Sequence, residues 1–172
     1  MKKTLIPTAL AFALVAVATL SAGSAFAQSN SASTSASASA RVVAAIALSK
    51  TADLSFGDIV ASGALGTVVM TSAGVRSATG GTTLGNTNGA ATAGFTVTGV
   101  SGSTYSITLP GGGASITGAG APMTVDTWTG SKAGGTLSSG SDTFTVGGTL
   151  HVGANQVAGS YTATFSVSVN YN

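Results

Sequence analysis

The clearest alternation of apolar and polar side chains lies at the C-terminal end of the chain, over residues 160–171. Even positions there are Ser, Thr or Asn. Successive side chains of a β-strand point to opposite faces, so this pattern predicts a long strand with one apolar and one polar face. The apolar face consists of Tyr161, Ala163, Phe165, Val167, Val169 and Tyr171.

Shorter runs rich in Thr and Val precede this segment and are separated by glycine-containing turns such as Asn88-Gly89 and Pro110-Gly111. Many short strands with regular turns are typical of a β-sandwich or a β-barrel. The expected strands are residues 54–60, 66–70, 94–98, 104–109, 123–128, 143–146 and 148–152. The expected core residues are Phe56, Phe95, Ile107, Val125, Trp128 and Phe144.

A second alternating segment begins at Ala36, after a Ser/Ala-rich tract that cannot bury a core alone. Its apolar face becomes bulkier toward the end, where it holds Val42, Ala44, Ile46 and Leu48. Alanine is the best helix former, so a helix is the competing interpretation. The β-branched pair Val42-Val43 and the Ser alternation favour a strand.

Residues 1–27 are typical of an export signal, with Lys2 and Lys3 before an apolar stretch and an A-x-A site at residues 25–27. We therefore expect cleavage after Ala27 and passage through the inner membrane to the periplasm, then to the cell surface. No long apolar run follows, so we expect no transmembrane helix after cleavage. The expected organisation is a signal peptide (1–27), a flexible extension (28–48) and a β-sandwich domain (49–172).

Charge and composition limit the functions of the chain. Of 172 residues only 6% are charged, and removal of the signal leaves four basic and four acidic side chains. A near-neutral surface favours association and gives no basic patch for nucleic acid.

The residues that usually perform catalysis are scarce. Cysteine is absent, there is one histidine, and the four acidic residues are all Asp. His151 alternates with Leu150 and Val152 and is expected at the surface, while Asp126 and Asp142 alone make a weak case for a glycosidase. We expect no metal site, no cofactor and no enzyme activity. Trp128 is a candidate ligand-stacking residue, although packing within the sheet is the simpler interpretation.

The C-terminal segment resembles the last strand of chaperone–usher pilus subunits, which have a penultimate Tyr and a Gly fourteen residues from the end. Here these are Tyr171 and Gly159. Residues 49–172 also resemble a secreted bacterial family known only as a domain of unknown function, with L-x-F-G at residues 54–57, G-G-T-L at 147–150 and the pattern G-x-Y-x-x-x-F-x-V-x-V-x-Y at 159–171.

The pilus resemblance implies an all-β, immunoglobulin-like sandwich that lacks one strand. A periplasmic chaperone would supply that strand before an outer-membrane usher assembles the fibre, in which the extension of the next subunit replaces it. The donor side chains would be Val42, Ala44, Ile46 and Leu48. The acceptor groove, or the C-terminal strand and core that adjoin it, would include Gly159, Tyr161, Phe165, Val167, Val169 and Tyr171. Unlike many pilus subunits, this chain has no cysteine.

Three interpretations remain open from the sequence. In the first, the protein self-associates as a structural fibre subunit through β-strand addition. In the second, it is a monomeric surface module that binds carbohydrate or a host surface through Trp128, Tyr105 and loops rich in Thr, Ser and Asn. In the third, residues 42–48 are the first strand of a complete sandwich.

Overall fold

The computed structural model describes residues 31–86 and 88–172, so the expected signal peptide lies outside the described residues. Residues 41–172 form one compact unit, and residues 31–40 belong to a separate unit. Residues 31–40 are exposed and have no regular secondary structure. Part of the predicted extension, from Arg41 to Leu48, therefore belongs to the compact unit.

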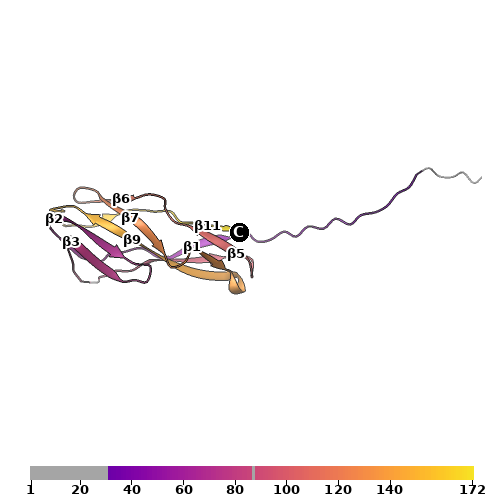
Figure 1. Ribbon diagram of the computed structural model, residues 1–172, viewed down its shortest axis with the longest axis horizontal. Coiled ribbons are helices and arrows are strands. Elements are labelled where there is room, and N and C mark those ends of the chain that lie inside the picture. Colours follow the sequence, from indigo (N-terminus) through magenta and orange to yellow (C-terminus); the bar gives the residue numbers. More distant parts are fainter. Residues whose placement is uncertain (1–30, 87) are drawn as a thin grey trace, which may run out of the picture. The chain divides into compact units, whose positions relative to one another are not determined.

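The larger sheet of the compact unit is antiparallel and has the strand order β1-β4-β9-β7-β6-β10. β4 pairs with the first half of β9 and β2 pairs with its second half, on the same edge, and β3 pairs with β2 (Figure 1). The strands are β1 (Ala47–Ala52), β2 (Ile59–Met70), β3 (Arg76–Leu84), β4 (Ala93–Thr98), β6 (Ala114–Gly118), β7 (Met123–Gly130), β9 (Ser141–Val152) and β10 (Tyr161–Thr162).

A second, three-stranded sheet consists of β11 (Ser168–Tyr171), β5 (Thr104–Thr108) and β8 (Gly134–Thr136). A short 3₁₀ turn, Ser138–Gly140, precedes β9. The described residues contain no α-helix, and among them no helix has the length and apolarity needed to cross a membrane. The expected all-β, antiparallel sandwich is confirmed.

Two clusters of buried side chains hold the strands together. One contains Phe56, Val68, Met70, Met123, Val125, Leu150 and Val152. The other contains Ala93, Phe95, Val97, Tyr105, Leu137, Phe144 and Val146. Trp128 packs against both clusters. Of the predicted core, Phe56, Phe95, Val125 and Phe144 are buried, while Ile107 and Trp128 are half-buried.

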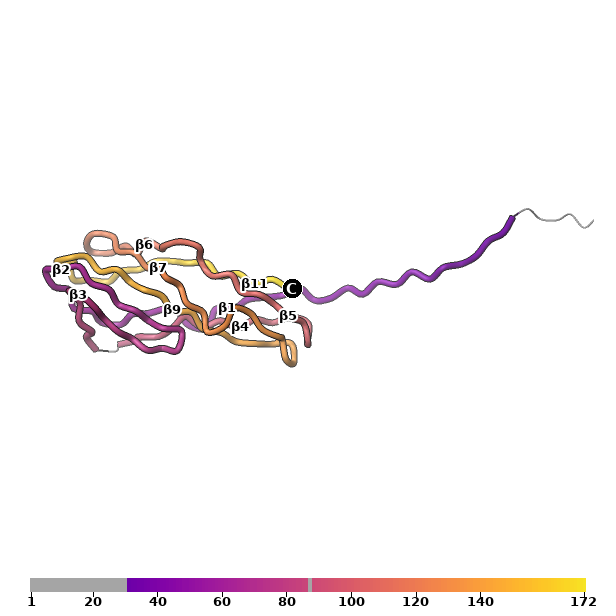
Figure 2. The backbone as a smooth tube through the Cα atoms, viewed as in Figure 1, coloured from indigo at the N-terminus to yellow at the C-terminus, as the bar shows by residue number. Residues whose placement is uncertain are grey.

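The predicted C-terminal strand is two short strands instead of one. β10 pairs with β6 of the large sheet, β11 pairs with β5 of the small sheet, and residues 163–167 between them belong to neither. The yellow end of the chain passes from β6 to β5 (Figure 2). The neighbouring chain between β5 and β6 bends at residues 111–112 and contains Pro110, which has no N–H to donate, and it does not pair with residues 163–167.

Other strand predictions differ in extent. The two runs at 143–146 and 148–152 are one strand, β9, and most of the run at 54–60 is irregular apart from a bridge between Ser55 and Ala91. β3 and β6 were not expected, because their glycines and Thr/Ser residues carry little hydrophobic alternation.

Candidate functional site

A groove lies between the end of β1 and the unpaired part of the C-terminal segment. Its cavity has a volume of about 140 Å³. Leu54, Ala93, Phe95 and Phe165 provide apolar walls. The remaining lining residues are Lys50, Ala52, Asp53, Ala163 and Thr164. Lys50 and Asp53 form an ion pair with each other, so the groove carries no uncompensated charge.

The backbone beside this groove is open. Residues 163–167 make no backbone hydrogen bond to other described residues. Among the strands of the described residues, β1 pairs with β4 alone. Unpaired N–H and C=O groups at a strand edge are a template for an additional strand.

The two aromatic side chains that line the groove pack against each other, and Trp128 packs behind one of them. Phe165 meets Phe95 edge to face, with ring centroids 6.5 Å apart, and stacks on Trp128 at 4.5 Å. The Trp128 indole N–H donates to the carbonyl of Gly112 at 2.8 Å. Trp128 stacks on Phe165 and donates a hydrogen bond to Gly112, so it has a packing role. Its ligand-stacking role remains a prediction.

Tyr171, the penultimate residue, ties three segments together. Its hydroxyl accepts from the backbone N–H of Val100 at 2.8 Å and donates to the carbonyl of Ala44 at 3.2 Å. A side chain at Gly99 would stand 2.2 Å from this hydroxyl, so glycine leaves the space that the tyrosine occupies. The end of β11 is thereby fixed to the segment that leads into β1.

Gly159 stands where the chain enters β10. Its φ of 149° lies in the region that glycine adopts most readily, and an added Cβ would approach that of Ala119 to 2.6 Å. The backbone angle and the close approach of Ala119 explain why a glycine stands at this position. It belongs to the approach to β10 and is not among the residues that line the groove.

The C-terminal side chains predicted to line the groove or its adjoining core pack on the core. Tyr161 packs on the first cluster of buried residues, and Phe165, Val167, Val169 and Tyr171 pack on the second. Only Phe165 of these also lines the groove.

The four predicted donor residues fall into two pairs. Ile46 and Leu48 are half-buried and pack on the chain's own second cluster, and Leu48 lies in β1 opposite Val97. Ala44 and Val42 precede β1 and are exposed, with Val42 97% exposed. The second pair alone is free to contact another molecule without loss of core packing.

The sequence model of the DUF4402 family, described as a domain of unknown function, matches residues 46–171. The chain belongs to the DUF4402 family. Searches of curated proteins and of solved structures gave no match. The matched region starts one residue before β1 and ends at Tyr171, so in this chain the DUF4402 domain includes both borders of the groove.

A polar network joins the two sheets of the DUF4402 domain. Asp142 on β9 accepts from the Lys132 ammonium at 2.8 Å, from the Tyr105 hydroxyl at 2.8 Å and from the backbone N–H of Thr143 at 2.8 Å. The Lys132 ammonium is the main cause that lowers the pKa of Asp142, against the opposing effect of burial. Burial first, and then Asp142, raises the pKa of Tyr105 to about 12.

This network predicts alkaline sensitivity. An unfolded tyrosine loses its proton near pH 10, whereas folded Tyr105 keeps it to about pH 12. A raised folded-state pKa contributes stability that is complete below the unfolded pKa and is lost as pH rises toward the folded pKa. The free energy of unfolding, measured by urea titration, should therefore fall between about pH 10 and pH 12.

Tyr105→Phe is the matched control, because it keeps the ring and removes the ionisable hydroxyl. The variant should show a smaller decrease in unfolding free energy over the same pH interval. Equal decreases in the two proteins would contradict the assignment.

Asp126 and the histidine His151 also form a hydrogen-bonded pair. Asp126 on β7 contacts His151 on β9, with 2.8 Å between Oδ1 and Nε2. The hydrogen bond from His151 is the main cause that lowers the pKa of Asp126. Asp126 and Asp142 thus have different partners, and the described residues hold no group of three or more metal-ligating side chains.

Proposed function

We propose that this DUF4402 protein is an exported structural subunit of a bacterial surface fibre. The extension of one subunit adds as a β-strand to the groove of the next. The observation that carries the proposal is the apolar groove beside residues 163–167, whose backbone has no hydrogen-bond partner in the described part of the chain. Main-chain hydrogen bonds would give affinity and the cavity would select one side chain.

The donor in this proposal is the part of the extension that precedes β1. Its inward face would hold Ala36, Ala38, Ala40, Val42 and Ala44. Val42 is the bulkiest of them and is 97% exposed, so it is the side chain suited to the cavity between Leu54, Phe95 and Phe165. Ile46 and Leu48 stay with their own core.

The length of the extension is sufficient. Residues 28–45 span roughly 60 Å when extended, and the C-terminal segment from residue 161 to 171 spans roughly 36 Å. The surplus connects one subunit to the next. Both surfaces are nearly uncharged, since the extension before Arg41 has no charged residue and the groove has only the Lys50–Asp53 pair. Removal of apolar surface from water would therefore not be opposed by charge desolvation.

Before assembly, an empty groove would favour aggregation. We include in the proposal that a periplasmic chaperone fills the groove and that an outer-membrane usher exchanges it for the next extension. The support is the same open edge, together with the export signal that the sequence predicts.

The direct test uses the exported mature protein on a denaturing gel, with and without boiling. Strand-exchanged subunits are held by continuous backbone pairing, so unboiled samples should show a ladder of multiples that collapses to the monomer after boiling. A monomer band in both lanes, for protein collected from the cell surface, would contradict the fibre.

A further inference from the structure

We infer that the outer face of the large sheet carries a binding site for an uncharged saccharide unit, in a hollow over β2, β3 and β9. The hollow has a volume of about 310 Å³, at the lower end of the usual range for ligand sites. It is lined by Leu65, Gly66, Thr67, Thr79, Gly80, His151 and Val152. It shares no lining residue with the groove proposed for the extension.

Two glycines let the backbones of β2 and β3 come close together beside the hollow. A Cβ at Gly66 would lie 2.7 Å from the carbonyl oxygen of Thr79, and one at Gly80 would lie 2.5 Å from that of Leu65. Gly80 also has a φ of +69°. The pairing of β2 with β3 shifts register between Ala61 and Gly66, so the hollow arises at an irregularity of the sheet.

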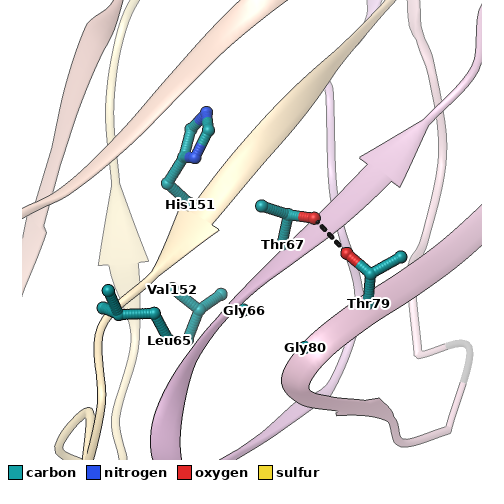
Figure 3. Close-up of a pocket in the computed structure, with 7 residues that line it drawn as sticks. All are labelled: Leu65, Gly66, Thr67, Thr79, Gly80, His151 and Val152. Atoms are coloured by element: carbon teal, nitrogen blue, oxygen red, sulfur yellow. Dashed lines mark hydrogen bonds between the residues drawn. The ribbon is translucent and has the colours of Figure 1, made fainter.

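Hydroxyl and imidazole groups line the hollow (Figure 3). Thr67 faces Thr79 on one side and His151 on the other in the strand register. The two threonine hydroxyls are 2.7 Å apart. One donates to the other, so the pair keeps one free O–H and free lone pairs for a ligand.

His151 is held in one orientation by Asp126. The carboxylate accepts from Nε2, which in the neutral imidazole leaves Nδ1 as an acceptor. Among the described residues Nδ1 has no hydrogen-bond partner. Sugar hydroxyls both donate and accept, so they match a rim with a free O–H, free lone pairs and a ring nitrogen.

The remaining features select an uncharged ligand with an apolar face. Leu65 is 74% exposed at the edge of the hollow and can cover the C–H face of a sugar ring. No Lys or Arg lines the hollow. The Asp126 carboxylate, which contacts the lining residue His151, would repel an anionic sugar.

The test is a proton NMR titration of the mature protein with methyl α-glucoside, methyl β-galactoside and N-acetylglucosamine. Because the chain has one histidine and one tryptophan, each gives a single set of assignable ring signals. At least one sugar should shift the His151 ring protons saturably and leave the Trp128 indole N–H unchanged. Glucuronate should bind more weakly than methyl α-glucoside.

Thr79→Val removes one hydroxyl at nearly constant volume and should weaken sugar binding about tenfold. Thr143→Val is the matched control, on the exposed face of β9 but outside the hollow, and should leave affinity unchanged. An unchanged Trp128 signal shows that each variant is folded. The inference is overturned if none of the three sugars shifts the His151 signals, if glucuronate binds best, or if the two variants behave alike.

Discussion

Deletion of residues 28–43 should abolish the heat-sensitive multimers and leave a folded monomer. The deletion ends before Ala44 because its carbonyl accepts from Tyr171, and because Ile46 and Leu48 pack on the core. It removes Val42 and the alternating alanines, which are the proposed donor. The measurement is the gel with and without boiling, supported by the molar mass in solution.

A synthetic peptide of residues 31–46 should then bind the shortened protein. Trp128 is the single tryptophan and stacks on Phe165, which lines the groove, so its fluorescence should change saturably with peptide. Val42→Asp in the peptide should weaken binding by about tenfold or more, because an apolar contact becomes a buried charge.

Val43→Asp is the matched control, since neighbouring residues of a strand point to opposite faces. The Val43→Asp peptide should bind nearly as well as the unchanged one. Multimers that persist after the deletion, or peptides that lose affinity equally with either substitution, would exclude the donor role of the extension.

Phe144→Ala should lower the free energy of unfolding by about 3–5 kcal/mol. Phe144 is 3% exposed, stacks on Phe95 with centroids 5.1 Å apart, and lies on β9 in the middle of the large sheet. Its removal leaves a cavity among strands that cannot move together freely. The free energy of unfolding of a typical domain is only about 5–15 kcal/mol, so this loss is a large fraction of it.

Urea unfolding followed by Trp128 fluorescence measures this change. Thr143 directly precedes Phe144 and is exposed, so Thr143→Ala should alter the free energy of unfolding by no more than about 0.5 kcal/mol. A loss below about 1 kcal/mol for Phe144→Ala would show that the site collapses around the deletion.

Local alternation predicted the strands whose two faces differ in polarity. β9 is the clearest case, since Leu150 and Val152 are buried and His151 between them is exposed. β3 escaped prediction because Gly80 and Gly81 interrupt it, and it forms through pairing with β2. β3 is stabilised by its pairing with β2, and the local alternation of side chains carries no information about that pairing.

The candidate sites depended still more on distant residues. The break at residues 163–167 lies between the pairing with β6 and the pairing with β5, more than forty residues earlier in the chain. The Asp126–His151 pair follows from the register of β7 and β9. The sequence pattern predicted the apolar face of the C-terminal segment and the exposure of His151. It did not separate the exposed residues Val42 and Ala44 from the half-buried Ile46 and Leu48, because all four continue one alternation.

The position of the C-terminal segment also bears on the kinetics of folding. β10 belongs to one sheet and β11 to the other, and Tyr171 bonds to Ala44, 127 residues away. Closing so long a loop costs entropy before any contact compensates for it, and topologies of this kind fold slowly. A chain that emerges from its N-terminus therefore cannot pair β6 with β10 or β5 with β11 until its last residues arrive, so these two strand edges are the last to be covered.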